Sequence, residues 1–142
     1  TRYASAEGLR RGGYVLADSS DDLPQVILIG TGSEVPLAVA AYEKLAAEGV
    51  RVRVVSMPSW HLFELQDDAW RESVLPSQVT ARLAIEQGGS LGWDRYVGRT
   101  GRTITMSTFG ASAPLAKLQE KFGFTLENAV KVARDMIPEK AS

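Results

Sequence analysis

The sequence predicts an α/β fold with three layers, in which a mostly parallel sheet of about five strands carries helices on both faces. Four consecutive apolar residues, Val26 to Ile29, are typical of a strand covered on both sides. Strand and helix patterns then alternate along the chain, which favours parallel strands joined by right-handed crossovers. The 142 residues, 44% of them hydrophobic, suffice for one core. We expect a domain over residues 13–142, preceded by a linker from an upstream domain over residues 1–12.

The first half of the domain reads as strand, strand and helix. Residues 13–16 predict a short edge strand, and the apolar run at 26–29 predicts a central one. Apolar residues at helical spacing follow and predict a helix over 34–48, with Ser33 as a natural N-cap. Gly49 is expected to end this helix at its C′ position, where glycine is favoured.

The middle of the domain contains two further strands with a helical connection between them. Valines alternate with arginines before Pro58, which predicts a strand over 51–57, and a core strand is expected over 82–86. Between them, residues 60–75 have the pattern of short helical turns. Asp67 is a suitable cap for one of these turns.

The C-terminal part continues the alternation. We expect one or two helical turns over 93–97 and a strand over 103–107. A helix should run from Pro114 to Gly123. Thr125 should cap a last helix, whose apolar face consists of Leu126, Val130, Ala133 and Ile137.

The turn of Thr31, Gly32 and Ser33 is the first candidate site, because ligands of open α/β sheets bind at the carboxyl ends of strands. A dinucleotide motif is incomplete here, since Val35 occupies the place of the third glycine. The backbone N–H groups of Gly32, Ser33 and Glu34 could cradle an anion at the helix N-terminus. Glu34 can satisfy the helix dipole itself, so a structural turn is favoured over an anion site.

Other residues offer weaker chemistry. His61 is the only histidine, which excludes a multi-histidine metal site and leaves a packed or surface side chain as the better interpretation. No Gly-x-Ser-x-Gly sequence surrounds Ser33, Ser107 or Ser112, which disfavours a serine hydrolase. The large aromatic residues of the connecting segments favour core packing over an interface. These are Trp60, Phe63, Trp70, Trp93 and Tyr96.

Composition limits the classes of partner. The formal net charge of −1 gives no reason to expect nucleic acid or an anionic membrane as a partner. No apolar run approaches the ~20 residues of a membrane-spanning helix. The absence of cysteine fits a reducing compartment, so we expect a cytoplasmic protein.

Several short motifs occur in a fixed order from about residue 12 to 137. They are Gly30-Thr31-Gly32-Ser33-Glu34-Val35, Ala40-Ala41-Tyr42 with Leu45, Val54-Val55-Ser56-Met57-Pro58, Arg71-Glu72-Ser73-Val74-Leu75-Pro76, Tyr96-Val97-Gly98, Thr108-Phe109-Gly110-Ala111-Ser112-Ala113-Pro114 and Phe122-Gly123-Phe124-Thr125. In this order and spacing they resemble the C-terminal domain of the transketolase family. The sequence Leu9-Arg10-Arg11-Gly12 resembles the linker that enters that domain.

The resemblance implies a parent enzyme of the pentose phosphate pathway that transfers a two-carbon ketol unit between sugar phosphates, with thiamine diphosphate and Mg²⁺ as cofactors. In that family the cofactor lies between an N-terminal and a middle domain, across a homodimer interface. The Gly-Asp-Gly metal motif, the several histidines and the cofactor-activating glutamate belong to those domains and are absent from this sequence. The resemblance therefore assigns no catalytic, cofactor-binding or metal-binding residue to this chain. Its expected partners are the two other domains of its own parent.

Three functions stay open on this evidence. The leading hypothesis is an accessory transketolase domain with a structural, assembly or regulatory role, inactive alone. The alternative is a small regulatory module that binds phosphate or a nucleotide at the Thr31-Gly32-Ser33 turn. An independent enzyme is disfavoured, because no nucleophile with a base, metal cluster or acid/base pair stands out.

Overall fold

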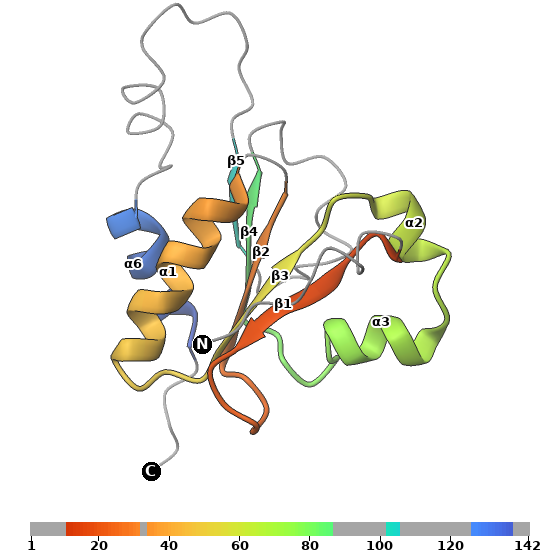
Figure 1. Ribbon diagram of the computed structural model, residues 1–142. Coiled ribbons are helices and arrows are strands. Elements are labelled where there is room, and N and C mark those ends of the chain that lie inside the picture. The colour runs from red at the N-terminus through yellow and green to blue at the C-terminus, as the bar shows by residue number, and fades with distance from the viewer. Residues whose placement is uncertain (1–10, 32–33, 87–101, 106–125, 138–142) are drawn as a thin grey trace, which may run out of the picture.

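A five-stranded sheet in the order β1-β3-β2-β4-β5 forms the centre of the computed structural model, which describes residues 11–31, 34–86, 102–105 and 126–137 (Figure 1). The strands are β1 (Tyr14–Asp18), β2 (Val26–Gly30), β3 (Val52–Ser56), β4 (Arg82–Glu86) and β5 (Arg102–Thr105). Strands β2, β3, β4 and β5 pair in parallel, whereas β1 pairs antiparallel with β3 at one edge. The prediction of a mostly parallel sheet of about five strands is confirmed.

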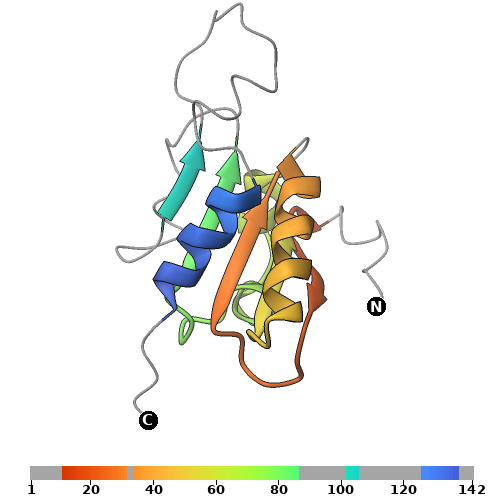
Figure 2. The ribbon, with the colours of Figure 1, turned by 90° about the vertical axis from the view of Figure 1, so that its left-hand side faces the viewer.

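Helices cover both faces of the sheet, as the sequence predicts. Helices α1 (Val35–Ala47) and α6 (Leu126–Met136) lie side by side on one face, which Figure 2 shows in front. The short helices α2 (Trp60–Glu64) and α3 (Asp68–Val74) pack on the other face (Figure 1). The apolar residues expected on the last helix lie in or against the core of the α1–α6 face.

The apolar run of β2 is explained by these two layers. Val26 and Leu28 belong to the core on the α1–α6 side, while Ile27 and Ile29 belong to the core on the α2–α3 side. All four side chains are 0% exposed. Because successive side chains of a strand point to opposite faces, only a continuous apolar run fits a strand covered on both sides.

The helix ends show which capping predictions hold. The Asp67 carboxylate accepts a hydrogen bond from the backbone N–H of Trp70 at 2.8 Å, which confirms Asp67 as the cap of α3. Gly49 has φ of 88° just after α1, as expected of a C′ glycine. Ser59, which the sequence interpretation did not single out, caps α2 by accepting from the N–H of Leu62 at 3.1 Å.

Several boundaries differ from the sequence-based expectations by one or two residues. The edge strand runs to Asp18 rather than ending at residue 16, and α1 begins at Val35 rather than at 34. Glu34 is the N-cap of α1 and makes no capping hydrogen bond through its side chain. Ser33, the turns expected over 93–97, the helix from Pro114 to Gly123 and the Thr125 cap all lie outside the described residues.

Candidate functional site

The order of the strands reverses between β2 and β4. From β2 the chain crosses through α1 to β3 on one side, and from β3 it crosses through α2 and α3 to β4 on the other side of β2. In open α/β sheets, ligands bind outside the carboxyl ends of the strands at such a reversal. Gly30 and Thr31 at the end of β2, with Glu86 at the end of β4, flank this position.

The turn after β2 is tightly built. The backbone N–H of Glu34 donates to the carbonyl of Thr31 at 2.9 Å, and the N–H of Met57 donates to the carbonyl of Gly30 at 2.9 Å. A Cβ atom at Gly30 would lie 3.1 Å from both Cβ of Ala38 and Cα of Val35. Glycine suits position 30 because α1 approaches the strand closely and leaves only a tight space for a Cβ atom.

A carboxyl group lies at the start of α1. The Glu34 residue is only 2% exposed, one of two buried polar or charged residues among those described. A negative charge at a helix N-terminus is stabilised by the helix dipole. The preference for a structural turn over an anion site stays a prediction from the sequence. Gly32 and Ser33 lie outside the described residues, and the anion site of Thr31, Gly32 and Ser33 stays a prediction.

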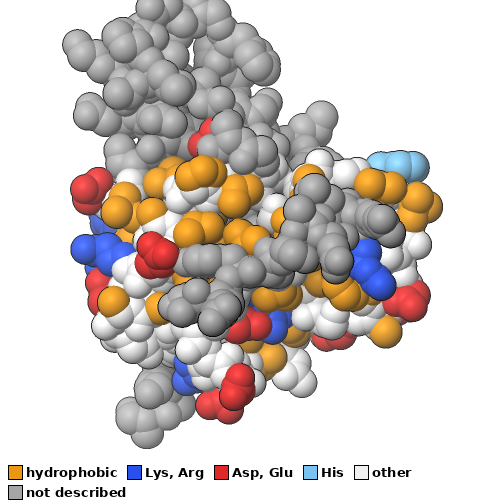
Figure 3. All heavy atoms as spheres, in the orientation of Figure 1, with side chains coloured by type: hydrophobic (Ala, Val, Ile, Leu, Met, Phe, Trp, Pro, Cys, Tyr) orange, Lys and Arg blue, Asp and Glu red, His pale blue; other side chains and the backbone are white. Residues whose placement is uncertain are grey.

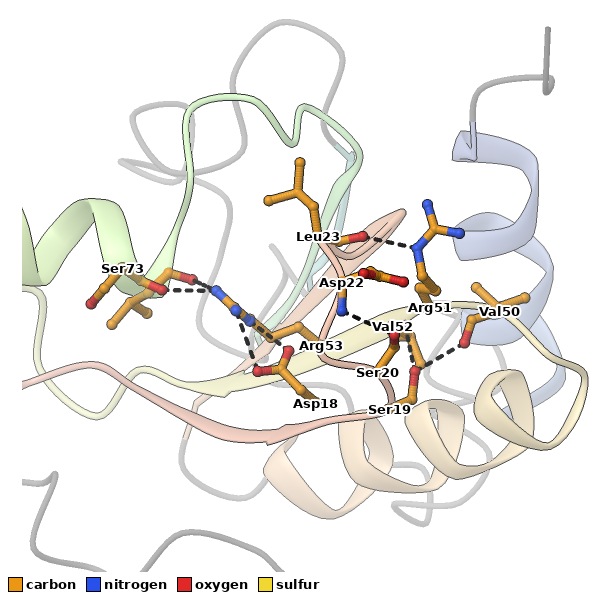
Figure 4. A network of polar contacts seen from close by, with 11 residues as sticks. Asp18, Ser19, Ser20, Asp22, Leu23, Val50, Arg51, Val52, Arg53 and Ser73 are labelled. Carbon is orange, nitrogen blue, oxygen red and sulfur yellow. Dashed lines mark hydrogen bonds and ion pairs between the residues drawn. The ribbon is translucent and has the colours of Figure 1, made fainter.

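A groove of about 760 Å³ lies near the amino end of β3, on the side of the sheet away from the turn after β2. It runs along the last turns of α1 and the segments after β1 and before β3. Its polar groups are engaged in the fold (Figure 4). The Ser19 hydroxyl donates to the carbonyl of Val50 at 3.0 Å and accepts from the N–H of Val52 at 2.9 Å. Nε of Arg51 donates to the carbonyl of Leu23 at 3.0 Å. These bonds hold the turns in place and do not converge on a ligand.

The Arg53 guanidinium is the most connected cation of this network. Its Nε lies 2.7 Å from Oδ1 of Asp18, which ties β3 to the edge strand β1. Its Nη1 donates to the carbonyls of Ser73 and Val74 at 2.8 and 3.0 Å, at the end of α3 (Figure 4). Arg53 therefore joins three elements that are distant in sequence.

A second groove, of about 450 Å³, lies between α2, α3 and the start of β4. Here Nε of Arg82 donates to the carbonyl of Val79 at 2.9 Å, and Nη2 donates to the carbonyl of Pro76 at 2.8 Å. Burial lowers the pKa of the Arg82 guanidinium, partly offset by Glu72, which raises it. The Arg82 guanidinium bonds to carbonyls of the segment between α3 and β4 and so stabilises that segment. We therefore assign it a structural role.

The structure describes only some of the remaining sequence candidates. The single histidine, pale blue in Figure 3, lies exposed on α2, so it is a surface side chain. Phe63 is 2% exposed and Trp70 is half-buried against the same core, in agreement with core packing. The Trp60 side chain, Trp93 and Tyr96, like Ser107 and Ser112, lie outside what the structure describes.

The described residues contain neither a metal-binding group nor a membrane-spanning helix. No group of three His, Asp or Glu side chains among them is placed to hold a metal ion. No helix in the same part of the chain has the length and apolar character needed to cross a membrane.

Sequence reasoning missed one set of contacts. Arg11 and Gly12, assigned to the linker, and Gly13, assigned to the start of the edge strand, lie against α2 and α3. The paired glycines were the available signal, because glycine is required where a backbone approaches another segment closely.

Comparison with known proteins gives a consistent result. The family described as "Transketolase-like TK C-terminal domain" matches residues 12–125. Transketolase 1 of Vibrio vulnificus strain YJ016 is 58% identical over 129 residues, which are 91% of this chain and 19% of that protein. Transketolase 1 of Escherichia coli strain K12 is 57% identical over 129 residues, with the same coverage of 91% and 19%.

Solved structures agree in fold. The transketolase from Leishmania mexicana superposes with a TM-score of 0.84 at 41% identity, covering 98% of this chain and 20% of that one. The chain thus spans about a fifth of the length of the proteins it matches.

Proposed function

Since the chain belongs to the transketolase family, as its C-terminal domain, we propose that it contributes to the structure, assembly or regulation of a parent enzyme and is not catalytic alone. The parent would transfer a two-carbon ketol unit between sugar phosphates. The observation that carries the proposal is the match of residues 12–125 to this one domain, together with the 58% identity over 129 residues to Transketolase 1 of Vibrio vulnificus strain YJ016.

The partners of the domain follow from the same proposal. They are the N-terminal and middle domains of its own parent chain, and the parent would be a homodimer. The difference in length supports this, because the matched region is only 19% of Transketolase 1 of Vibrio vulnificus strain YJ016. The cysteine-free composition supports a cytoplasmic location for the parent.

The cofactors of transketolases, thiamine diphosphate and a divalent metal, do not fit the described residues of this chain. Mg²⁺ takes oxygen ligands from carboxylates and phosphates. The described residues hold no group of three His, Asp or Glu side chains that could bind a metal. The resemblance to transketolases implies that the ligands come from the other domains of the parent, so no catalytic step is assigned to side chains of this domain.

Calorimetry tests the proposal directly. The purified chain is titrated with thiamine diphosphate and Mg²⁺, and its ketol transfer is followed in a coupled assay beside a full-length transketolase as positive control. We expect no saturable binding and no turnover above the blank without protein. Micromolar binding or measurable turnover by the chain alone would show that the domain has a larger role.

The position of Thr31 favours a second candidate function. We propose, as the alternative, that the Thr31-Gly32-Ser33 turn binds phosphate or a nucleotide as a regulatory site, because it follows β2 where the strand order reverses. Phosphate should then shift the amide NMR signals of Gly32, Ser33 and Glu34. Gly32→Val should weaken the effect by steric block. Unchanged signals on addition of phosphate would remove this alternative.

A further inference from the structure

The segment just before β1 is fastened to the α2–α3 layer by three contacts. The N–H of Ser59 donates to the carbonyl of Gly12 at 2.9 Å. The indole Nε1–H of Trp70 donates to the carbonyl of Gly13 at 3.1 Å. The Arg11 guanidinium carbon lies 4.3 Å from the centroid of the Trp70 ring, within the range of a cation–π interaction.

The backbone of this segment packs closely against its neighbours. A Cβ atom at Gly12 would collide with the backbone N–H of Phe63 and the carbonyl of Ser59, and Gly12 has φ of +78°. A Cβ atom at Gly13 would lie 2.7 Å from Cδ1 of Phe63. Phe63 is itself 2% exposed and belongs to the core of this face. The two glycines therefore rest directly on a buried part of the molecule.

We propose that residues 11–13 form a fixed joint, which holds the polypeptide preceding residue 11 at one position on the α2–α3 layer. The Trp70 side chain fastens the joint at two residues, by its ring against Arg11 and by its N–H to Gly13. The hydrogen bond to the Gly12 carbonyl comes from Ser59, which is also the N-cap of α2. This bond therefore links the joint to the start of that helix. The chain therefore enters the domain at a fixed point on this layer.

Proteolysis measures whether the joint is closed. Trypsin cleaves after arginine, and the Arg11–Gly12 bond lies inside the joint, so it can be cut only when the joint opens. All proteins carry Arg10→Gln, which removes the neighbouring site, and mass spectrometry quantifies the peptide that ends at Arg11. A synthetic peptide of residues 5–18 with the same change gives the rate for an open chain. We expect the folded protein to be cut at least tenfold more slowly than the peptide.

Two glycine variants distinguish opening of the joint from overall destabilisation as the cause of faster cleavage. Gly12 and Gly49 both have positive φ, but a Cβ atom at Gly49 meets nothing within 4 Å. Gly12→Ala should therefore accelerate cleavage after Arg11 at least tenfold, whereas Gly49→Ala should leave it within about twofold. Equal acceleration by both variants would mean that overall destabilisation, not the joint, controls the cleavage.

Trp70→Phe provides the second test, and it decides the matter if Gly12→Ala does not fold. Phenylalanine keeps an aromatic ring on the core but cannot donate to Gly13. Loss of one such hydrogen bond should accelerate cleavage about two- to tenfold. In the unchanged protein the indole N–H signal of Trp70 should exchange with solvent at least tenfold more slowly than a free indole. Cleavage of the unchanged protein at the peptide rate, or free exchange of this N–H, would overturn the proposal.

Discussion

Replacing Arg53 with methionine should destabilise the fold far more than the same replacement at Arg51. Arg53 is a strand residue whose side chain is only 14% exposed, and its guanidinium bonds to Asp18 and to the carbonyls of Ser73 and Val74. Methionine keeps most of the aliphatic stem and removes every one of these bonds. The comparison is Arg51→Met, which loses one bond, from Nε to the Leu23 carbonyl.

The size of the effect follows from these contacts. A hydrogen bond contributes about 0.5–1.5 kcal/mol net, and the part-buried Val74 carbonyl, left without this donor, adds to the loss. The ion pair with Asp18 contributes up to ~1 kcal/mol, because the Asp18 side chain is 33% exposed. Arg53→Met should therefore lower the free energy of unfolding by about 2–3 kcal/mol. Arg51→Met should lower it by about 0.5–1 kcal/mol.

Urea unfolding followed by circular dichroism measures both values. The midpoint should fall without a change in the m-value, since neither variant alters the surface exposed on unfolding. Thermal unfolding should show a loss of about 6–12 °C for Arg53→Met. If the two variants lie within ~0.5 kcal/mol of each other, the three-way connection made by Arg53 does not stabilise the fold as argued.

Three further changes test other parts of the structure. Leu28→Ala should lower the free energy of unfolding, measured by urea titration, by about 3–5 kcal/mol, because Leu28 is 0% exposed in the central strand. A loss under ~1.5 kcal/mol would contradict its place in the core. Arg134→Gln breaks an ion pair with Glu48 in which the two side chains are 50% and 37% exposed. The free energy of unfolding should therefore fall by at most ~1 kcal/mol, and by less in high salt. An unchanged loss at about 1 M salt would argue against an ionic origin. Burial, with the charges of Asp18 and Glu43, raises the pKa of Tyr42 above its ordinary value of 10.0, so the folded state keeps this proton longer than the unfolded state and stability should fall as the pH rises past about 10. Tyr42→Phe should flatten that fall in urea titrations, and an equal slope in both proteins would refute the assignment.

Local pattern was enough to predict the parts of the fold that depend on neighbours in sequence. The run Val26–Ile29 indicates a strand covered on both faces, and Asp67 precedes its helix at the capping position. Gly49 is a further case, since a glycine after a helical pattern commonly takes positive φ.

Contacts between distant segments could not be predicted in the same way. Alternation places Arg53 on the opposite face of its strand from Val52 and Val54, but its partner Asp18 is 35 residues away and is brought near only by the antiparallel edge strand. Gly12 lies in a stretch without hydrophobic period, which favoured a linker, and only the position of α2 gives it a neighbour. Burial of Glu34 likewise depends on how α1 meets the sheet, which residue type alone does not indicate.

The direction of β1 determines how this domain is best attached to a surface. Because β1 is antiparallel to β3, Tyr14 pairs with Ser56, and the chain enters at the edge of the sheet where the parallel strands end. Helix α6 finishes at the opposite edge, where Arg134 pairs with Glu48 at the end of α1 (Figure 2). An affinity tag placed before residue 11 would therefore be attached on the side of the sheet where the parallel strands end, which is also the side of the turn that follows β2. Immobilisation through the α6 end leaves that edge facing the solution, and it is the orientation to choose when ligands are screened.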